Sequence, residues 1–179
     1  MKKKFIDLII LILITIISTI LILNVLYKGN PVLNVIIKDN ENNLEYLTIF
    51  DNGKTKNTDE FNNIEFSKYS IDCTKFDSKI ENNKIYNNVN DSIIYDIDGK
   101  AINNSIIKDL VLKIVDNIHH EIYYLDIFEL DGKFYPFVKL NVNWNDPCYL
   151  YEYDTINKKI NKLYVWQDVD LVGISNVEK

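Results

Sequence analysis

The chain has 179 residues, enough for one membrane anchor and one ordinary domain. Residues 28–179 hold 25 acidic residues against 17 lysines, and this net charge of −8 argues against nucleic acid or anionic lipid as a partner of the domain. Isoleucine, asparagine and lysine are abundant and arginine is absent. This bias indicates an AT-rich, bacterial coding genome, and it weakens the meaning of asparagine-rich stretches.

The N-terminus predicts a single-pass membrane anchor. Lys2, Lys3 and Lys4 precede an apolar run over residues 5–27, and about 20 helical residues cover the roughly 30 Å of a bilayer's hydrocarbon core. Lysines stay on the cytoplasmic side, so residues 28–179 are expected outside the cytoplasm, extracellular or periplasmic. A cleaved signal peptide is the alternative. The length of the run and the lack of an Ala-x-Ala-like site after it favour the uncleaved anchor.

A β-hairpin is predicted directly after the anchor. Apolar runs at 32–37 and 44–50 flank a polar connection. Asp51, Asn52 and Gly53 then give a turn signal.

The middle of the chain is less regular. Residues 55–63 are polar and loop-like. Residues 64–80 mix aromatic and polar side chains without a clean period, which predicts an irregular segment with room for one strand. The stretch 81–92 is either a linker between two lobes or a long surface loop, and the asparagine bias favours the loop. A strand is predicted at 93–97.

Residues 105–118 predict an amphipathic helix, with Asn104 or Ser105 as its N-cap. His119 and His120 follow at its C-terminal end, where their partial charge suits the helix dipole. The apolar face repeats at helical spacing and comprises Ile106, Ile107, Leu110, Val111, Ile114, Val115 and Ile118.

Antiparallel strands are predicted after the helix. Residues 122–130 are apolar on both faces and should be central, and the Asp131–Gly132 turn leads into 134–140, where Pro136 suggests an edge or a bulge. Further strands are predicted at 148–153, 160–166 and 169–174. The fold class is therefore α+β: an N-terminal transmembrane helix, then a mainly antiparallel β domain with one helix packed on a C-terminal meander.

The stretch from Leu150 to Trp166 is similar to one blade hairpin of bacterial β-propellers. The chain contains no second copy at a fixed period. The resemblance therefore implies a hairpin, and it implies no site.

Two cysteines, Cys73 and Cys148, have two readings. In an exported domain they can form a disulfide that closes a loop of about 75 residues, for roughly 4 kcal/mol of stability. The alternative is two buried thiols, and the sequence leaves both open.

A candidate aromatic binding face lies on the last hairpin. Tyr149, Tyr151 and Tyr153 alternate onto one face of a strand, and Tyr164 and Trp166 share a face of the next. If the two faces coincide, they form a platform for a glycan or a protein partner. The alternative, aromatic core packing or ring pairs across the hairpin, is favoured.

The sequence predicts no catalytic residue, metal site or cofactor. His119 and His120 are adjacent, no serine lies in a Gly-x-Ser-x-Gly elbow, and no glycine-rich phosphate loop is present. Asp126 and Glu129 fall on opposite faces of one strand, so they do not converge on an ion.

Three functions follow from these observations. The leading one is a non-enzymatic, membrane-tethered interaction domain that binds another protein at or near the membrane surface. The second is an immunity or inhibitor protein that neutralises a secreted toxin or hydrolase, because a small acidic domain suits a basic partner. A cell-wall-acting enzyme is the least favoured, since no catalytic signature supports it.

Overall fold

The computed structural model describes residues 10, 12–20, 29–73, 78–81, 84–87, 100–118, 122–140 and 147–177. Residues 12–20 are helical. The other elements are β1 (Pro31–Lys38), β2 (Leu44–Phe50), β3 (Thr55–Asn57), β4 (Ser67–Asp72), β5 (Ser78–Glu81), β6 (Lys84–Asn87), α2 (Ser105–Asn117), β7 (Ile122–Leu130), β8 (Lys133–Leu140), β9 (Pro147–Asp154), β10 (Lys159–Gln167) and β11 (Asp170–Ser175).

A five-stranded antiparallel sheet, in the order β10-β9-β8-β7-β4, forms the middle of the molecule. Its first four strands are the predicted C-terminal meander, and β7 lies between β8 and β4, as its two apolar faces indicated. β8 is central as well, although Pro136 suggested an edge. Its ladder with β9 pairs Phe134 and resumes only at Phe137, because proline has no N–H to donate.

A second antiparallel sheet has the order β11-β1-β2-β3. The predicted hairpin of β1 and β2 is confirmed, and the last strand, β11, returns to pair with β1. Residues 55–57 were expected in a loop, but they pair with β2 as the short edge strand β3.

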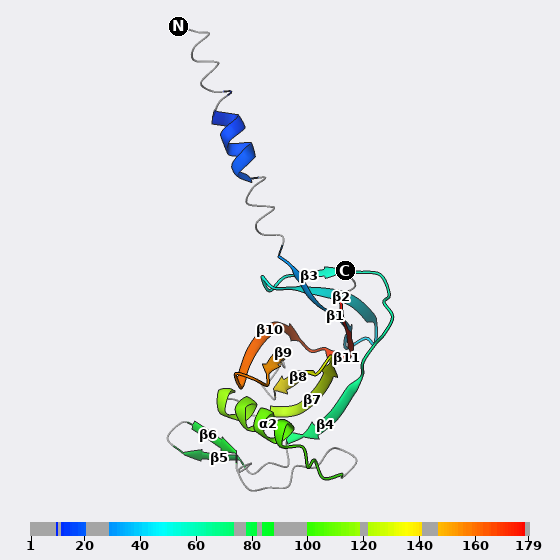
Figure 1. Cartoon of the computed structure of the whole chain (residues 1–179), viewed down its shortest axis with the longest axis vertical. Helices are drawn as coiled ribbons and strands as arrows, with labels where there is room; N and C mark the ends of the chain where they lie inside the picture. The colour runs from blue at the N-terminus through cyan, green and yellow to red at the C-terminus, as the bar shows by residue number, and fades with distance from the viewer. Residues whose placement is uncertain are drawn as a thin grey trace.

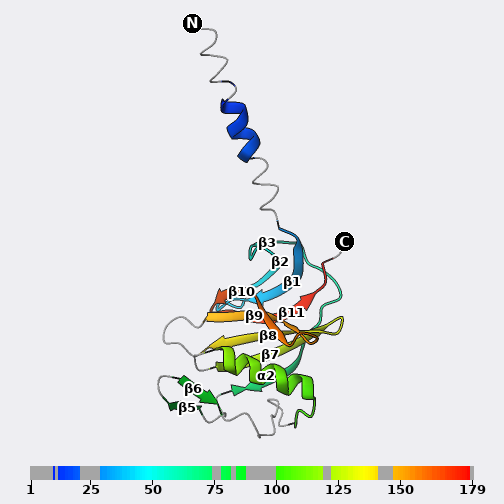
Figure 2. The same ribbon diagram turned by 60° about the vertical axis from the view of Figure 1, so that its left-hand side comes forward.

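The folded part has three layers, and α2 and the four-stranded sheet cover opposite faces of the five-stranded sheet (Figures 1 and 2). Alternation along β7 explains both contacts, because Leu125 and Ile127 pack under the helix while Phe128 and Leu130 pack against the other sheet. The helix presents five buried residues to its core: Ile107, Leu110, Val111, Ile114 and Val115. The α+β prediction with mainly antiparallel strands is therefore confirmed.

The chain crosses from one sheet to the other between β3 and β4. Glu65 pairs with Ile174 of β11, and two residues later Ser67 pairs with Phe128 of β7. Ile64, just before the crossing, packs over Gly173, where an added Cβ would lie 2.5 Å from the Ile64 Cγ2 atom. This crossing creates the junction at which the candidate site lies.

The predicted linker or loop 81–92 is only partly described. Its first residues belong to a small hairpin, in which β5 pairs with β6. The expected strand at 93–97, together with His119 and His120, lies outside the described residues.

The predicted membrane anchor, residues 5–27, overlaps the described chain at residues 10 and 12–20. In that described part, no helix is both long and apolar enough to cross a bilayer. Helical residues 12–20 lie apart from the sheets (Figure 1), and their isoleucine and leucine side chains are about half exposed.

Candidate functional site

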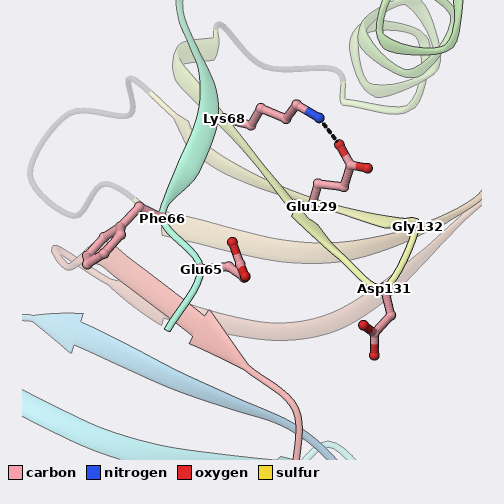
Figure 3. Close-up of a pocket in the computed structure, with 6 residues that line it drawn as sticks. All are labelled: Glu65, Phe66, Lys68, Glu129, Asp131 and Gly132. Carbon is pink, nitrogen blue, oxygen red and sulfur yellow. Dashed lines mark hydrogen bonds and ion pairs between the residues drawn. The ribbon is translucent and has the colours of Figure 1, made fainter. Parts of the chain in front are cut away.

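An open groove lies at the junction where the chain crosses between the two sheets (Figure 3). Its hollow has a volume of about 480 Å³. The groove lining comprises Glu65, Phe66, Lys68, Glu129, Asp131 and Gly132. These residues come from the crossing segment, from β4 and from the β7–β8 hairpin.

Backbone pairing holds the first wall of the groove. The Glu65 amide donates to the Ile174 carbonyl oxygen at 2.8 Å, and the Ile174 amide donates back to Glu65 at 3.0 Å. Phe66 lies between Glu65, which pairs with β11, and Ser67, which pairs with β7. Its backbone is therefore fixed, while its side chain is 64% exposed. Figure 3 shows the Phe66 ring on the side of the strand opposite the Glu65 carboxylate, so the ring forms the rim of the groove.

The opposite wall is the tight turn between β7 and β8. Asp131 and Gly132 both have positive φ, 50° and 75°, which is the conformation expected of a two-residue Asp-Gly hairpin turn. The Asn176 side-chain amide donates to Asp131 Oδ2 at 2.6 Å and ties this turn to the chain that follows β11.

An ion pair crosses one end of the groove (Figure 3), where the Lys68 ammonium donates to the Glu129 carboxylate. This hydrogen bond raises the pKa of Lys68. The Glu65 and Asp131 carboxylates remain, so the lining carries three negative charges and one positive charge. The groove therefore has the chemistry to attract a cationic group.

The predicted aromatic face is divided between the two sides of the five-stranded sheet. Tyr149, Tyr151 and Tyr153 pack on the core under α2, whereas Tyr164 and Trp166 pack on the core between the sheets. The two faces therefore do not coincide, and the five side chains do not form one shared platform.

The cause of this division is a β-bulge in β10. Lys162 pairs with Tyr151, but the register then shifts by one residue, so that Tyr164 pairs with Leu150 instead of Tyr149. One extra residue in a strand sends every following side chain to the other face. No residue type in this hairpin marks the position of the bulge.

Each aromatic row packs locally. The Tyr149 and Tyr151 rings stack with their centroids 6.1 Å apart, and the Tyr164 and Trp166 rings lie 4.6 Å apart. Tyr153 is buried, and its hydroxyl donates to Asp109 of α2, which joins the helix to the sheet. The rows pack as core and as neighbouring ring pairs, close to the alternative that the sequence favoured.

The two cysteines are buried thiols in separate cores, and no disulfide joins them. Cys73 lies in the core under α2, and its Sγ donates to the Ile71 carbonyl oxygen at 3.7 Å. Cys148 lies between the sheets, where burial raises its pKa. The five-stranded sheet separates the two thiols. The structure therefore agrees with the alternative of two buried thiols.

A partly buried carboxyl group lies between the two sheets. Asp126 of β7 accepts a hydrogen bond from the Ser70 hydroxyl, and burial raises its pKa to about 6, with a further increase from the charge of Asp170. Asp170 itself pairs with Lys139 at 3.2 Å and with Lys38 at 3.8 Å. As alternation predicted, Asp126 and Glu129 do not converge, because Glu129 lines the groove and Asp126 faces the second sheet.

Within the described part of the chain, no group of three or more His, Cys, Asp or Glu side chains is arranged to hold a metal ion. Sequence reasoning missed Glu65, Phe66 and Lys68, because they lie in the aperiodic segment 64–80. The Asp131–Gly132 turn is the one local sequence signal near the groove, and it predicts a hairpin without indicating the opposite wall.

No family model, no curated protein and no solved structure matches this chain.

Proposed function

We propose that this protein is a non-enzymatic, membrane-tethered interaction domain. In this proposal residues 5–27 anchor it in the bilayer with the N-terminus in the cytoplasm. Residues 28–179 lie outside the cytoplasm, and the groove binds another protein at the membrane surface.

The observation that carries the tether is the apolar surface of the helical residues 10 and 12–20. Seven isoleucine and leucine side chains are between 49% and 58% exposed: Ile10, Ile12, Leu13, Ile14, Ile16, Ile17 and Ile20. So many exposed apolar side chains on one segment are costly in water, and they are favourable in lipid.

The polar side chains of the same segment are satisfied within the helix. The Thr15 hydroxyl donates to the Ile12 carbonyl oxygen at 2.8 Å, and the Ser18 and Thr19 hydroxyls donate to the Thr15 carbonyl oxygen at 2.9 and 2.7 Å. A hydroxyl that donates a hydrogen bond within its own helix keeps that bond in lipid, where no water is present to accept one. The free-energy cost of moving it from water into lipid is therefore small. This bonding supports the anchor.

The start of the domain supports a fixed position close to the bilayer. The Asn30 backbone and side-chain amides each donate to Asp51 at 2.9 Å, and these bonds lower the pKa of Asp51. Gly29 has a φ of 66°, and an added Cβ would lie 2.7 Å from the Asn52 side chain. The chain is therefore held against the β2–β3 turn by the residue just before β1, so only a short connection separates an anchor that ends at residue 27 from the fold.

The groove supports the binding role. Backbone pairing holds one wall of the groove and the tight turn holds the other. The groove therefore loses little conformational entropy when a partner binds. Phe66, an aromatic side chain exposed at the rim, is the type of residue that contributes most to protein interfaces.

Photocrosslinking tests this proposal. Benzoylphenylalanine replaces Phe66 in the full chain, expressed in its own cells, and a matched variant carries it at Tyr123, which is 52% exposed and does not line the groove. We expect a protein adduct of defined mass from position 66 that is absent from position 123. No adduct from position 66, or the same adducts from both positions, contradicts a docking role for the groove.

A second function, an immunity or inhibitor protein, is favoured by the acidic lining of the groove. Under this proposal the protein trapped at position 66 is a secreted basic toxin or hydrolase, and cells that lack this chain become sensitive to it. Unchanged sensitivity of those cells to the trapped protein contradicts the immunity role and leaves the interaction domain in place.

A further inference from the structure

We infer that the groove takes an extended, basic polypeptide segment, and this inference rests on the proposed function above. A lysine or arginine of the partner lies between Glu65 and Asp131, and an apolar side chain of the partner packs on Phe66.

The acidic side chains are only partly used by the fold. The Glu65 carboxylate has no hydrogen-bond or ion-pair partner among the described residues, whereas its backbone is paired with Ile174. Asp131 accepts from Asn176 through Oδ2 alone. A cationic side chain bound in the groove can therefore form charge-assisted hydrogen bonds to Glu65 or Asp131, and no internal ion pair has to break.

Lys68 does not cancel this charge. Its ammonium group is held by Glu129, and that hydrogen bond raises the pKa of the lysine, so the pair stays formed at neutral pH. Two uncompensated carboxylates remain on a domain whose own net charge is −8. Charge complementarity of this sign speeds the encounter with basic partners and repels acidic ones.

The shape of the groove favours a polypeptide as its occupant. Glu65 and Phe66 are neighbours whose side chains leave opposite sides of one strand (Figure 3). A ligand that contacts both must pass over the strand at the rim, with a cation on one side and an apolar group on the other. An extended peptide presents successive side chains to opposite sides in the same way.

The test uses the full chain in nanodiscs of zwitterionic phosphatidylcholine, which gives a basic probe no anionic lipid to bind. The probe is a fluorescent octapeptide of alternating lysine and leucine, and its counterpart carries glutamate in place of lysine. Fluorescence anisotropy measures the affinity of each peptide. We expect the lysine peptide to bind more tightly than the glutamate peptide, with an affinity that falls as salt is added.

Variants locate the binding. Glu65→Gln combined with Asp131→Asn should weaken binding of the lysine peptide by about five- to tenfold, since each charge pair near a surface contributes up to about 1 kcal/mol. The control combines Glu45→Gln with Asp116→Asn, two exposed carboxylates outside the groove, and changes the net charge equally. The control should change the affinity less than about twofold. Phe66→Ala should weaken binding about fivefold or more.

Equal losses in the groove variant and the control overturn the inference, because they indicate diffuse charge alone. Equal binding of the lysine and glutamate peptides also overturns it. If position 66 still traps a protein in cells while the lysine peptide does not bind, the interaction domain stands and the basic partner is wrong. If the lysine peptide binds at the groove while position 66 traps nothing in cells, the proposed function fails instead.

Discussion

At the scale of single residues, Asp126 lies where a neutral group would suit the fold better than a charge. It lies in the middle of a mainly apolar strand, on the face that packs against the second sheet, and its pKa is raised to about 6 from an ordinary 3.8. Well below pH 4 the carboxyl is protonated in both the folded and the unfolded chain. Between pH 4 and 6 the unfolded chain releases its proton first, so the free energy of unfolding falls as pH rises.

Asp126→Asn should therefore stabilise the protein at neutral pH. Asparagine keeps an oxygen that accepts from the Ser70 hydroxyl, and it removes the cost of the buried charge, which reaches about 3 kcal/mol above pH 6. Urea unfolding of the full chain in micelles, followed by tryptophan fluorescence, should give a gain of about 1–3 kcal/mol at pH 7 and almost none at pH 4. A loss of stability at pH 7, or an equal change at both values of pH, contradicts this account of Asp126.

Single residues also show where sequence reasoning stops. An Asp in the middle of an apolar strand was visible, and alternation placed it correctly on the face opposite Glu129. The burial that raises its pKa comes from the second sheet, which reaches it only through tertiary packing. Likewise, two cysteines about 75 residues apart gave no information on which side of a sheet each would lie.

At the scale of elements, the start of helix α2 is determined by its N-cap, a local feature that can be recognised in the sequence. Asn104 caps α2, and its Oδ1 accepts from the backbone amides of Ile106 at 2.9 Å and Ile107 at 3.4 Å. The predicted helix, 105–118, differs from the observed helix by one residue at its end.

Asn104→Ala should cost about 1 kcal/mol of unfolding free energy, because it leaves these two amides without their side-chain acceptor. Asn103→Ala is the matched control, since Asn103 is an exposed neighbour outside the cap. Thermal unfolding is monitored by circular dichroism. The midpoint of the transition should be lower for Asn104→Ala and unchanged for Asn103→Ala. Equal decreases in the unfolding midpoint of the two variants would contradict the role of the cap, because they would show an effect of the loop in general.

Hairpins were predicted because their information is local. The Asp131–Gly132 turn and the apolar runs beside it determine the pairing of β7 with β8, and the same holds for β1 with β2. The division of strands into two sheets could not be predicted, because β11 pairs with β1 across most of the chain and the crossing segment carries no periodic pattern. The faces of Tyr164 and Trp166 could not be predicted either. Alternation assigns side chains to a face of the sheet only as far as the next bulge, and the bulge in β10 lies just before Tyr164.

At the scale of the whole molecule, one set of features supports a tether and another supports a binding surface. The apolar helical segment lies apart from the fold (Figure 1), and the clamp of Asn30 on Asp51 shortens the connection to the domain. The groove lies on the acidic domain. Under the proposed function, a basic partner would reach it at the membrane surface. In the proposed function, residues 28–179 have to lie outside the cytoplasm.

Labelling of an introduced thiol tests that requirement most directly. Ile156 is 90% exposed at the tip of the β9–β10 turn, where Asp154 accepts from the backbone amides of Ile156 and Asn157 at 2.9 and 3.0 Å. Cys73 and Cys148 are 5% and 0% exposed, so the wild-type chain gives little background.

The measurement treats intact cells that express Ile156→Cys with a membrane-impermeant maleimide and follows the label in the membrane fraction after an alkaline carbonate wash. We expect labelling before lysis, on a chain that stays in the washed membranes. Labelling only after lysis, or release of the labelled chain by the wash, would contradict the tethered, outward-facing domain.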